Sequence, residues 1–174
     1  MYRLLLIILT ALTYTFTVSA QTYHGTRVHT WYNDIPISMY LPEEYFSSIQ
    51  YYPVLYLLHG TGENEESWFK SGNAEQIFDQ LIGNGGMRKM IIVMPYSSGV
   101  TDGSYENSFK DLMSFIERNF RVHKGKRYHA IAGLSLGGFY AMHISHRFYN
   151  KFDYVGIFSA IYTTDKMSIF KKDS

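Results

Sequence analysis

Short apolar blocks recur along this chain, and their spacing alternates between that of strands and that of helices. Four continuous apolar runs predict strands that are buried on both faces of a sheet: 54–58, 90–94, 129–133 and 154–158. Near the amino end, 26–32 and 35–41 predict an antiparallel pair of strands with Asn33-Asp34 as the turn.

Apolar residues three and four positions apart predict helices between these strands, over 74–82, 109–120 and 136–148. The glycines of Asn84-Gly85-Gly86 are expected to end the first of them. Strands that alternate with helices imply right-handed crossovers and a mostly parallel sheet. The pattern therefore predicts an α/β sandwich, and no repeat or linker divides it.

The first twenty residues have a different pattern, that of a secretory signal peptide. Arg3 precedes an apolar run over 4–12, and small residues close the segment at Val18-Ser19-Ala20. We expect residues 1–20 to be cleaved and 21–174 to form one secreted or periplasmic domain, with no membrane contact after cleavage. The alternative is an uncleaved anchor, although the apolar run is short for a span.

Composition narrows the function classes further. The 174 residues carry a formal charge of +1, and the basic residues do not cluster, which argues against nucleic acid as a partner. The chain has no cysteine, so neither a disulfide nor a lipid anchor on a thiol is possible. No histidine or carboxylate cluster has the spacing of a metal site.

One motif predicts covalent chemistry. Gly133-Leu134-Ser135-Leu136-Gly137 is a G-x-S-x-G sequence between a predicted strand and a predicted helix. A turn this tight requires neighbours without side chains, which Gly133, Gly137 and Gly138 provide. It would expose the Ser135 hydroxyl and direct the Leu136 N–H toward a developing oxyanion. The alternative is a glycine-rich turn that only packs a helix on the sheet.

A second element, His59-Gly60-Thr61-Gly62, ends an early predicted strand. Such a step usually supplies the other oxyanion donor, and the Thr61 N–H is the candidate. We interpret His59 as orienting this loop rather than as a base. A nucleotide-binding loop is excluded, because Glu65 replaces the third glycine of a dinucleotide fingerprint and no Lys-Ser/Thr pair follows.

Four segments together resemble the esterase D family, which includes feruloyl, acetylxylan and enterochelin esterases: 52–60, 92–95, 115–122 and 132–138. The resemblance runs from about residue 34 to Ala160. It implies an α/β-hydrolase three-layer sandwich and hydrolysis of carboxylic esters, often feruloyl or acetyl esters of polysaccharides, without metal or cofactor. It also implies Ser135 as nucleophile, Leu136 and Thr61 as the oxyanion hole, and a substrate cleft at His59, Gly60 and Trp68 that the segment from Glu63 to Trp68 borders.

The chain departs from that family after Ala160. In this fold the catalytic acid and histidine follow the nucleophile, but the last fourteen residues hold only Asp165 and Asp173 and no histidine. His143 lies roughly 12 Å from Ser135 along the predicted helix. We therefore expect the final strands to be lacking and the strand at 154–158 to form an uncovered apolar edge. Three alternatives to an active esterase remain open: a catalytically dead fragment, a carbohydrate-binding pseudoenzyme and an acyltransferase.

Overall fold

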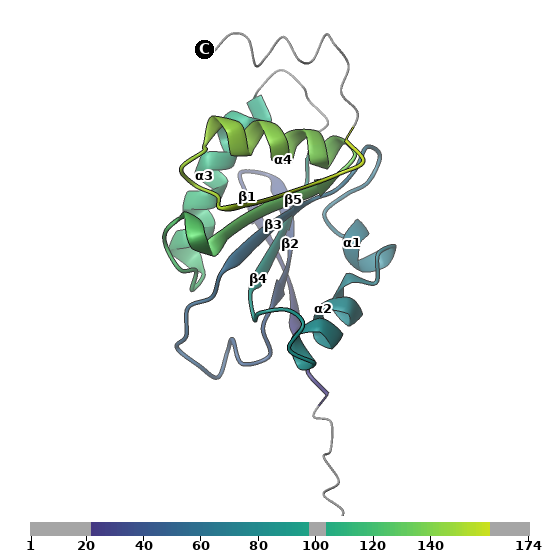
Figure 1. Ribbon diagram of the computed structural model, residues 1–174, viewed down its shortest axis with the longest axis vertical. Helices are drawn as coiled ribbons and strands as arrows, with labels where there is room; N and C mark the ends of the chain where they lie inside the picture. Colours follow the sequence, from purple (N-terminus) through teal and green to yellow (C-terminus); the bar gives the residue numbers. More distant parts are fainter. Residues whose placement is uncertain (1–21, 98–103, 161–174) are drawn as a thin grey trace, which may run out of the picture.

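A mixed six-stranded sheet forms the centre of the structure, a computed structural model that describes residues 22–97 and 104–160 (Figure 1). Its strands are β1 (Thr26–Tyr32), β2 (Ile35–Leu41), β3 (Val54–Leu58), β4 (Ile91–Pro95), β5 (His129–Leu134) and β6 (Tyr154–Phe158). Their order across the sheet is β1-β2-β4-β3-β5-β6. β1 and β2 run antiparallel to their neighbours, and the other four strands are mutually parallel. The predicted signal peptide and the two aspartates near the carboxyl end lie outside the described residues.

Helices cover both faces of this sheet. Figure 1 shows α3 (Ser104–Asn119) and α4 (Leu136–Arg147) on one side of it, and α1 (Ser67–Lys70) and α2 (Ala74–Gly83) on the other. A short 3-10 turn, η1 (Lys126–Tyr128), leads into β5. In the part of the chain that the structure describes, none of the helices has the length and hydropathy to cross a bilayer.

The alternation of side chains along the strands produces these layers. Tyr56 and Val93 point into the apolar cluster beneath α3 and α4. Leu57 and Ile92, their chain neighbours, point into the cluster beneath α1 and α2. Because both faces are covered, the strands need continuous apolar runs instead of an alternating pattern. The predicted three-layer α/β sandwich is confirmed.

The hairpin at the amino end follows its predicted geometry. Tyr32 pairs with Ile35, so two residues form the connection. Both have positive φ, 45° at Asn33 and 62° at Asp34. This is the type I′ arrangement, whose twist matches the strands that it joins and which asparagine and aspartate tolerate better than most residues.

β6 lies at the edge of the sheet, and its outer side pairs with no strand of the described residues. Four of its five side chains are large and apolar, yet Tyr154 is 62 % exposed, Val155 46 %, Ile157 43 % and Phe158 54 %. The predicted apolar edge at 154–158 is therefore present. A free strand edge with such side chains is a template for pairing with another chain.

We predict that the purified chain self-associates through β6 and that Ile157→Lys lowers its association constant by about tenfold or more, because a lysine on a free edge opposes pairing. Sedimentation velocity over a concentration series measures the change. The control is Trp31→Lys, which replaces an exposed apolar residue on β1 at the opposite edge. Equal association of wild type and Ile157→Lys would contradict this role of β6.

His129, the first residue of β5, links stability to pH. It is 1 % exposed, and its burial lowers the pKa of the imidazole below its ordinary value. The unfolded chain therefore takes up a proton near pH 6.5, whereas the folded chain does not. This contribution to stability is complete above that pH and is lost as the pH falls.

We predict that the free energy of unfolding decreases from pH 7 to pH 5 and that the decrease is smaller in His129→Gln. Glutamine does not titrate, but its amide can still donate a hydrogen bond where the His129 ring now meets the His123 carbonyl, at 3.0 Å. Urea denaturation of both proteins at the two pH values gives the comparison. The prediction fails if the decrease is the same in both.

Candidate active site

The turn between β5 and α4 holds Ser135 in an unusual backbone conformation. Its φ is 55° and its ψ is −114°, a combination that costs a residue with a side chain on the order of 1–3 kcal/mol. Two backbone hydrogen bonds maintain it: the Ser135 N–H donates to Phe158 O at 2.8 Å, and the Phe139 N–H donates to Ser135 O at 3.0 Å. The side chain is half-buried and does not cap α4. The hydroxyl is therefore available for other chemistry.

Glycines surround this turn because backbone contacts backbone there. A Cβ on Gly133 would lie 2.2 Å from the Gly137 carbonyl carbon. A Cβ on Gly137 would lie 2.4 Å from Leu58 O, at the end of β3, and one on Gly138 would lie 3.0 Å from Gly133 O. Real Cβ atoms do not approach backbone at the first two distances. The three glycines thus allow β3, β5 and the start of α4 to meet closely enough to form the turn.

Two backbone N–H groups stand near Ser135. The Leu136 N–H belongs to the first residue of α4, where the helix dipole favours negative charge. Thr61 lies in the loop after β3, next to Gly60, and a Cβ on Gly60 would lie only 3.6 Å from the Ser135 Cβ. Neither N–H group donates to another residue within 22–97 or 104–160. Both N–H groups stay the predicted donors to an oxyanion.

His59 anchors the loop that carries Thr61. Its side chain is buried, at 2 % exposure, between this loop and Ser97, which follows β4. Nε2 accepts from the Ser97 N–H at 3.0 Å, and Nδ1 therefore carries the proton and donates to Gly60 O at 2.8 Å. Since both ring nitrogens are engaged in this way, the structure places His59 as a tie between β3 and β4, beneath the loop.

Glu63 is the first residue of the segment that is expected to border the substrate cleft, and its carboxylate bonds within the loop. The Gly60 N–H donates to its Oε2 at 2.7 Å, which closes a tight turn over 60–63. A Cβ on Gly60 would lie 3.2 Å from that oxygen as well as 3.6 Å from the Ser135 Cβ. The carboxylate thus faces the same small space as Ser135. The expectation for this segment did not include the bond from Gly60 to Glu63, because it depends on the fold of the loop.

Trp68 lies on α1, where its side chain is partly buried against the apolar cluster beneath α1 and α2. No hydrogen bond or ring contact of the described residues joins it to Ser135 or to the loop at 59–63. Its place at the substrate cleft stays a prediction. The structure brings Ser135 and the three glycines of the turn next to Gly60, which Thr61 follows in the loop.

Histidines of the described part of the chain do not bond to Ser135. His143 is buried on α4 with its ring 4.1 Å from that of Phe139. His29 lies on β1 with Nε2 3.3 Å from Glu65 Oε1. Within 22–97 and 104–160, no three histidine or carboxylate side chains are arranged to hold a metal ion.

Comparisons of the sequence with known proteins all point to esterases. The sequence profile of the family described as "Putative esterase" matches residues 29–171. A protein of Xylanibacter ruminicola named endo-1,4-beta-xylanase/feruloyl esterase is 36 % identical over 137 residues, which are 70 % of this chain and 19 % of that protein. An esterase of Mycobacterium tuberculosis, MT1326, is 32 % identical over 130 residues, which are 67 % of this chain and 27 % of that protein.

A solved structure of a ferulic acid esterase is similar in fold. The TM-score is 0.72 and the identity 28 %, over 80 % of this chain and 60 % of the esterase. This chain therefore spans about three fifths of that solved structure, and a smaller share of the two relatives. The expected resemblance to feruloyl esterases is confirmed.

The steric role of Gly137 leads to a stability prediction. We expect Gly137→Ala to lower the free energy of unfolding by about 3 kcal/mol or more, because the added carbon meets the rigid carbonyls of Leu58 and His59. Gly85→Ala is the matched control: its added carbon meets open space, and only the φ of 76° opposes it, at roughly 1–2 kcal/mol. Chemical denaturation measures both. A cost at Gly137 no larger than that at Gly85 would contradict the close packing of the turn.

Proposed function

This chain belongs to the "Putative esterase" family, and we propose that it is a serine carboxylic-ester hydrolase that acts through an acyl-enzyme. The observation that carries the proposal is the strained φ of Ser135, close to Gly60 and to two N–H groups, of Leu136 and Thr61, that donate to no described residue. Strain of this kind persists only where the surrounding structure imposes it, and it is frequent at functional sites. A turn that merely packs a helix needs neither the strain nor the donors.

The proposed reaction begins with attack of Ser135 Oγ on the ester carbonyl carbon. Solvent water takes the serine proton as the Oγ–carbon bond forms, and the carbonyl oxygen becomes an oxyanion that accepts from the N–H groups of Leu136 and Thr61. Collapse of this intermediate breaks the carbon–oxygen bond to the alcohol, which takes a proton back from solvent, and leaves the acyl group on Ser135. Water then releases the acid and restores the hydroxyl.

The described residues supply the nucleophile and the oxyanion donors, and no imidazole among them bonds to Ser135. In a serine hydrolase, loss of the histidine reduces turnover on the order of 10⁶, whereas the oxyanion hole and binding retain 10³–10⁴ over water. We therefore expect slow turnover of ordinary esters. Reagents with a very reactive leaving group should still label Ser135.

The proposed substrates are feruloyl or acetyl esters, as small molecules or on polysaccharides. The support is the feruloyl esterase named among the relatives at 36 % identity and the ferulic acid esterase fold. We also propose that the protein is exported, on the basis of the leader-like pattern over residues 1–20. An exported esterase would meet polysaccharide esters outside the cell.

Covalent labelling tests the nucleophile. We predict that a fluorophosphonate adds one equivalent of mass to the wild-type chain and none to Ser135→Ala, because the strained turn presents only this hydroxyl next to the oxyanion donors. Ser114→Ala, which removes an exposed hydroxyl on α3, should label like the wild type. Intact-mass spectrometry provides the measurement. Undiminished labelling of Ser135→Ala would exclude Ser135 as the nucleophile.

A further inference from the structure

A cavity lies at the end of the sheet opposite Ser135. Ser135 follows the carboxyl end of β5, whereas His129 and Ala130, at the amino end of the same strand, line this cavity. Residues at the amino ends of β3 and β6, Val54 and Tyr154, complete the same wall. The volume is about 280 Å³, at the lower limit of small-molecule sites. A ligand here would be small and would not contact Ser135.

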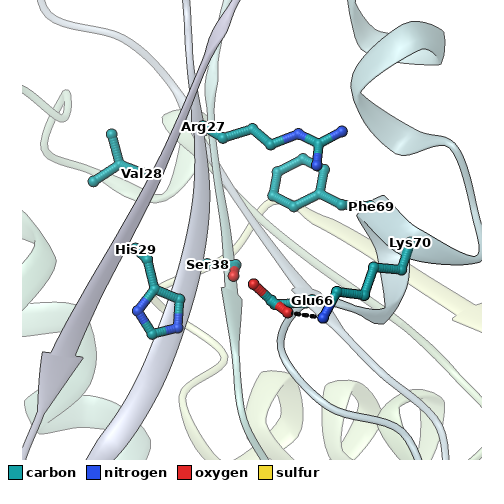
Figure 2. Close-up of a pocket in the computed structure, with 7 residues that line it drawn as sticks. All are labelled: Arg27, Val28, His29, Ser38, Glu66, Phe69 and Lys70. Carbon is teal, nitrogen blue, oxygen red and sulfur yellow. Dashed lines mark ion pairs between the residues drawn. The ribbon is translucent and has the colours of Figure 1, made fainter.

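Its cations distinguish this cavity from another one, of about 150 Å³, between β1 and α1 (Figure 2). There the positive groups already have acidic partners: Arg27 pairs with Glu75, and Lys70 pairs with Glu66. Arg27 also stacks on Phe69, 4.5 Å from its ring centre. Because each of these cations is already paired with a carboxylate, we do not expect an anion to bind in this smaller cavity.

The cavity at the amino end of β5 is lined by two arginines, Arg88 and Arg127. Neither forms an ion pair with a carboxylate of the described residues. The Arg127 guanidinium lies 4.6 Å from the ring centre of Tyr128 and donates to its hydroxyl. Stacking on a ring limits the freedom of the guanidinium and keeps its remaining donors available. Two guanidinium groups without acidic partners favour a carboxylate, which they can bind through paired N–H donors.

His129 lies at the back of this wall and offers a ligand no accessible polar atom, since the residue is buried. Its Nε2 donates to His123 O at 3.0 Å, so Nδ1 of the neutral ring has a lone pair. That Nδ1 is buried and has no hydrogen-bond partner among the described residues. A ligand in the cavity does not reach it, and the polar groups that line the cavity and can bind a ligand are those of the arginines and tyrosines.

The rest of the wall is apolar and aromatic. Pro53, Val54, Met90 and Ala130 provide aliphatic surface, and Tyr128 and Tyr154 provide rings. Aromatic rings prefer such surroundings and stack on tyrosine in offset or edge-on geometry. A ligand with a flat aromatic ring therefore fits this lining better than a ligand such as a sugar, which carries hydroxyl groups on all sides.

We infer that this cavity binds a small aromatic carboxylate. The carboxylate binds Arg88 and Arg127, and the ring lies against the aliphatic and tyrosine surface. This binding site is distinct from the proposed esterase site and does not require Ser135.

The test is a titration of the ¹⁵N-labelled full chain with ferulate, followed by amide NMR. All proteins carry Ser135→Ala, so that ester ligands stay intact and failure of the proposed hydrolysis cannot affect the result. We expect saturable shifts of the amides of Ala130 and Tyr154. We also expect Arg88→Ala/Arg127→Ala to weaken this binding by about tenfold or more, equivalent to at least about 1.4 kcal/mol.

Two ligands and one variant serve as controls. Methyl ferulate, which lacks the charge, and glucuronate, which lacks the ring, should each bind at least about tenfold more weakly. Arg147→Ala removes an exposed arginine from α4 and should bind ferulate like the parent protein. Three results would overturn the inference: shifts confined to Gly60 and Leu136, no shifts at all, or glucuronate binding as tight as that of ferulate. If the double alanine variant unfolds, Arg127→Lys takes its place. Lysine keeps the charge but cannot bind a carboxylate through two parallel N–H donors, so binding of ferulate should still weaken measurably.

Discussion

The close contact of backbone with backbone at the carboxyl end of the sheet is the constraint on which this site depends. Gly137 packs against the carbonyls of Leu58 and His59, at distances that no Cβ would allow. Its own φ is not in the left-handed region, so the requirement for glycine is one of space alone. This contact brings α4 onto the end of β3 and forces the positive φ at Ser135. The serine and the Leu136 N–H owe their placement to it.

The same contact positions the other half of the site, because it joins α4 to the loop after β3. His59 and Glu63 then hold that loop by two separate hydrogen bonds to Gly60, one to its carbonyl and one to its N–H. A neutral histidine is required, since Nε2 must accept from Ser97. Both the N–H and the carbonyl of Gly60 are therefore held by hydrogen bonds, and Thr61 is the next residue of the loop. If the Thr61 N–H is the oxyanion donor that we propose, it needs no rearrangement when charge develops.

Most of the fold could be predicted from the sequence, for physical reasons that individual elements make clear. The buried parallel strands are continuous apolar runs, and β6 was bounded correctly at both ends because charged and polar residues flank it. Asn33-Asp34 indicated the hairpin through its tolerance of positive φ. In contrast, α1 has four residues, too few to show helical periodicity, and it was not predicted.

The site was less accessible to such reasoning. The G-x-S-x-G pattern identified the turn, since its glycines are adjacent in sequence. The bond from Gly60 to Glu63 and the unpaired Nδ1 of His129 depend on where loops and strands meet in space, and no local pattern records them. Trp68 is expected at the cleft by resemblance, and its side chain packs partly against the apolar cluster beneath α1 and α2, a contact that no local pattern records. Side-chain direction from a short helix is set by tertiary packing.

The central claim is that one strained serine shares an oxyanion site with two backbone donors from different elements. A crystal structure of the chain after phosphonylation would test it most directly, because the phosphonyl oxygen mimics the oxyanion. We predict phosphorus bonded to Ser135 Oγ, with its free oxygen about 2.7–3.1 Å from the backbone nitrogens of both Leu136 and Thr61, and φ still positive at Ser135. A phosphonyl oxygen directed to solvent, with neither nitrogen in reach, would contradict the account.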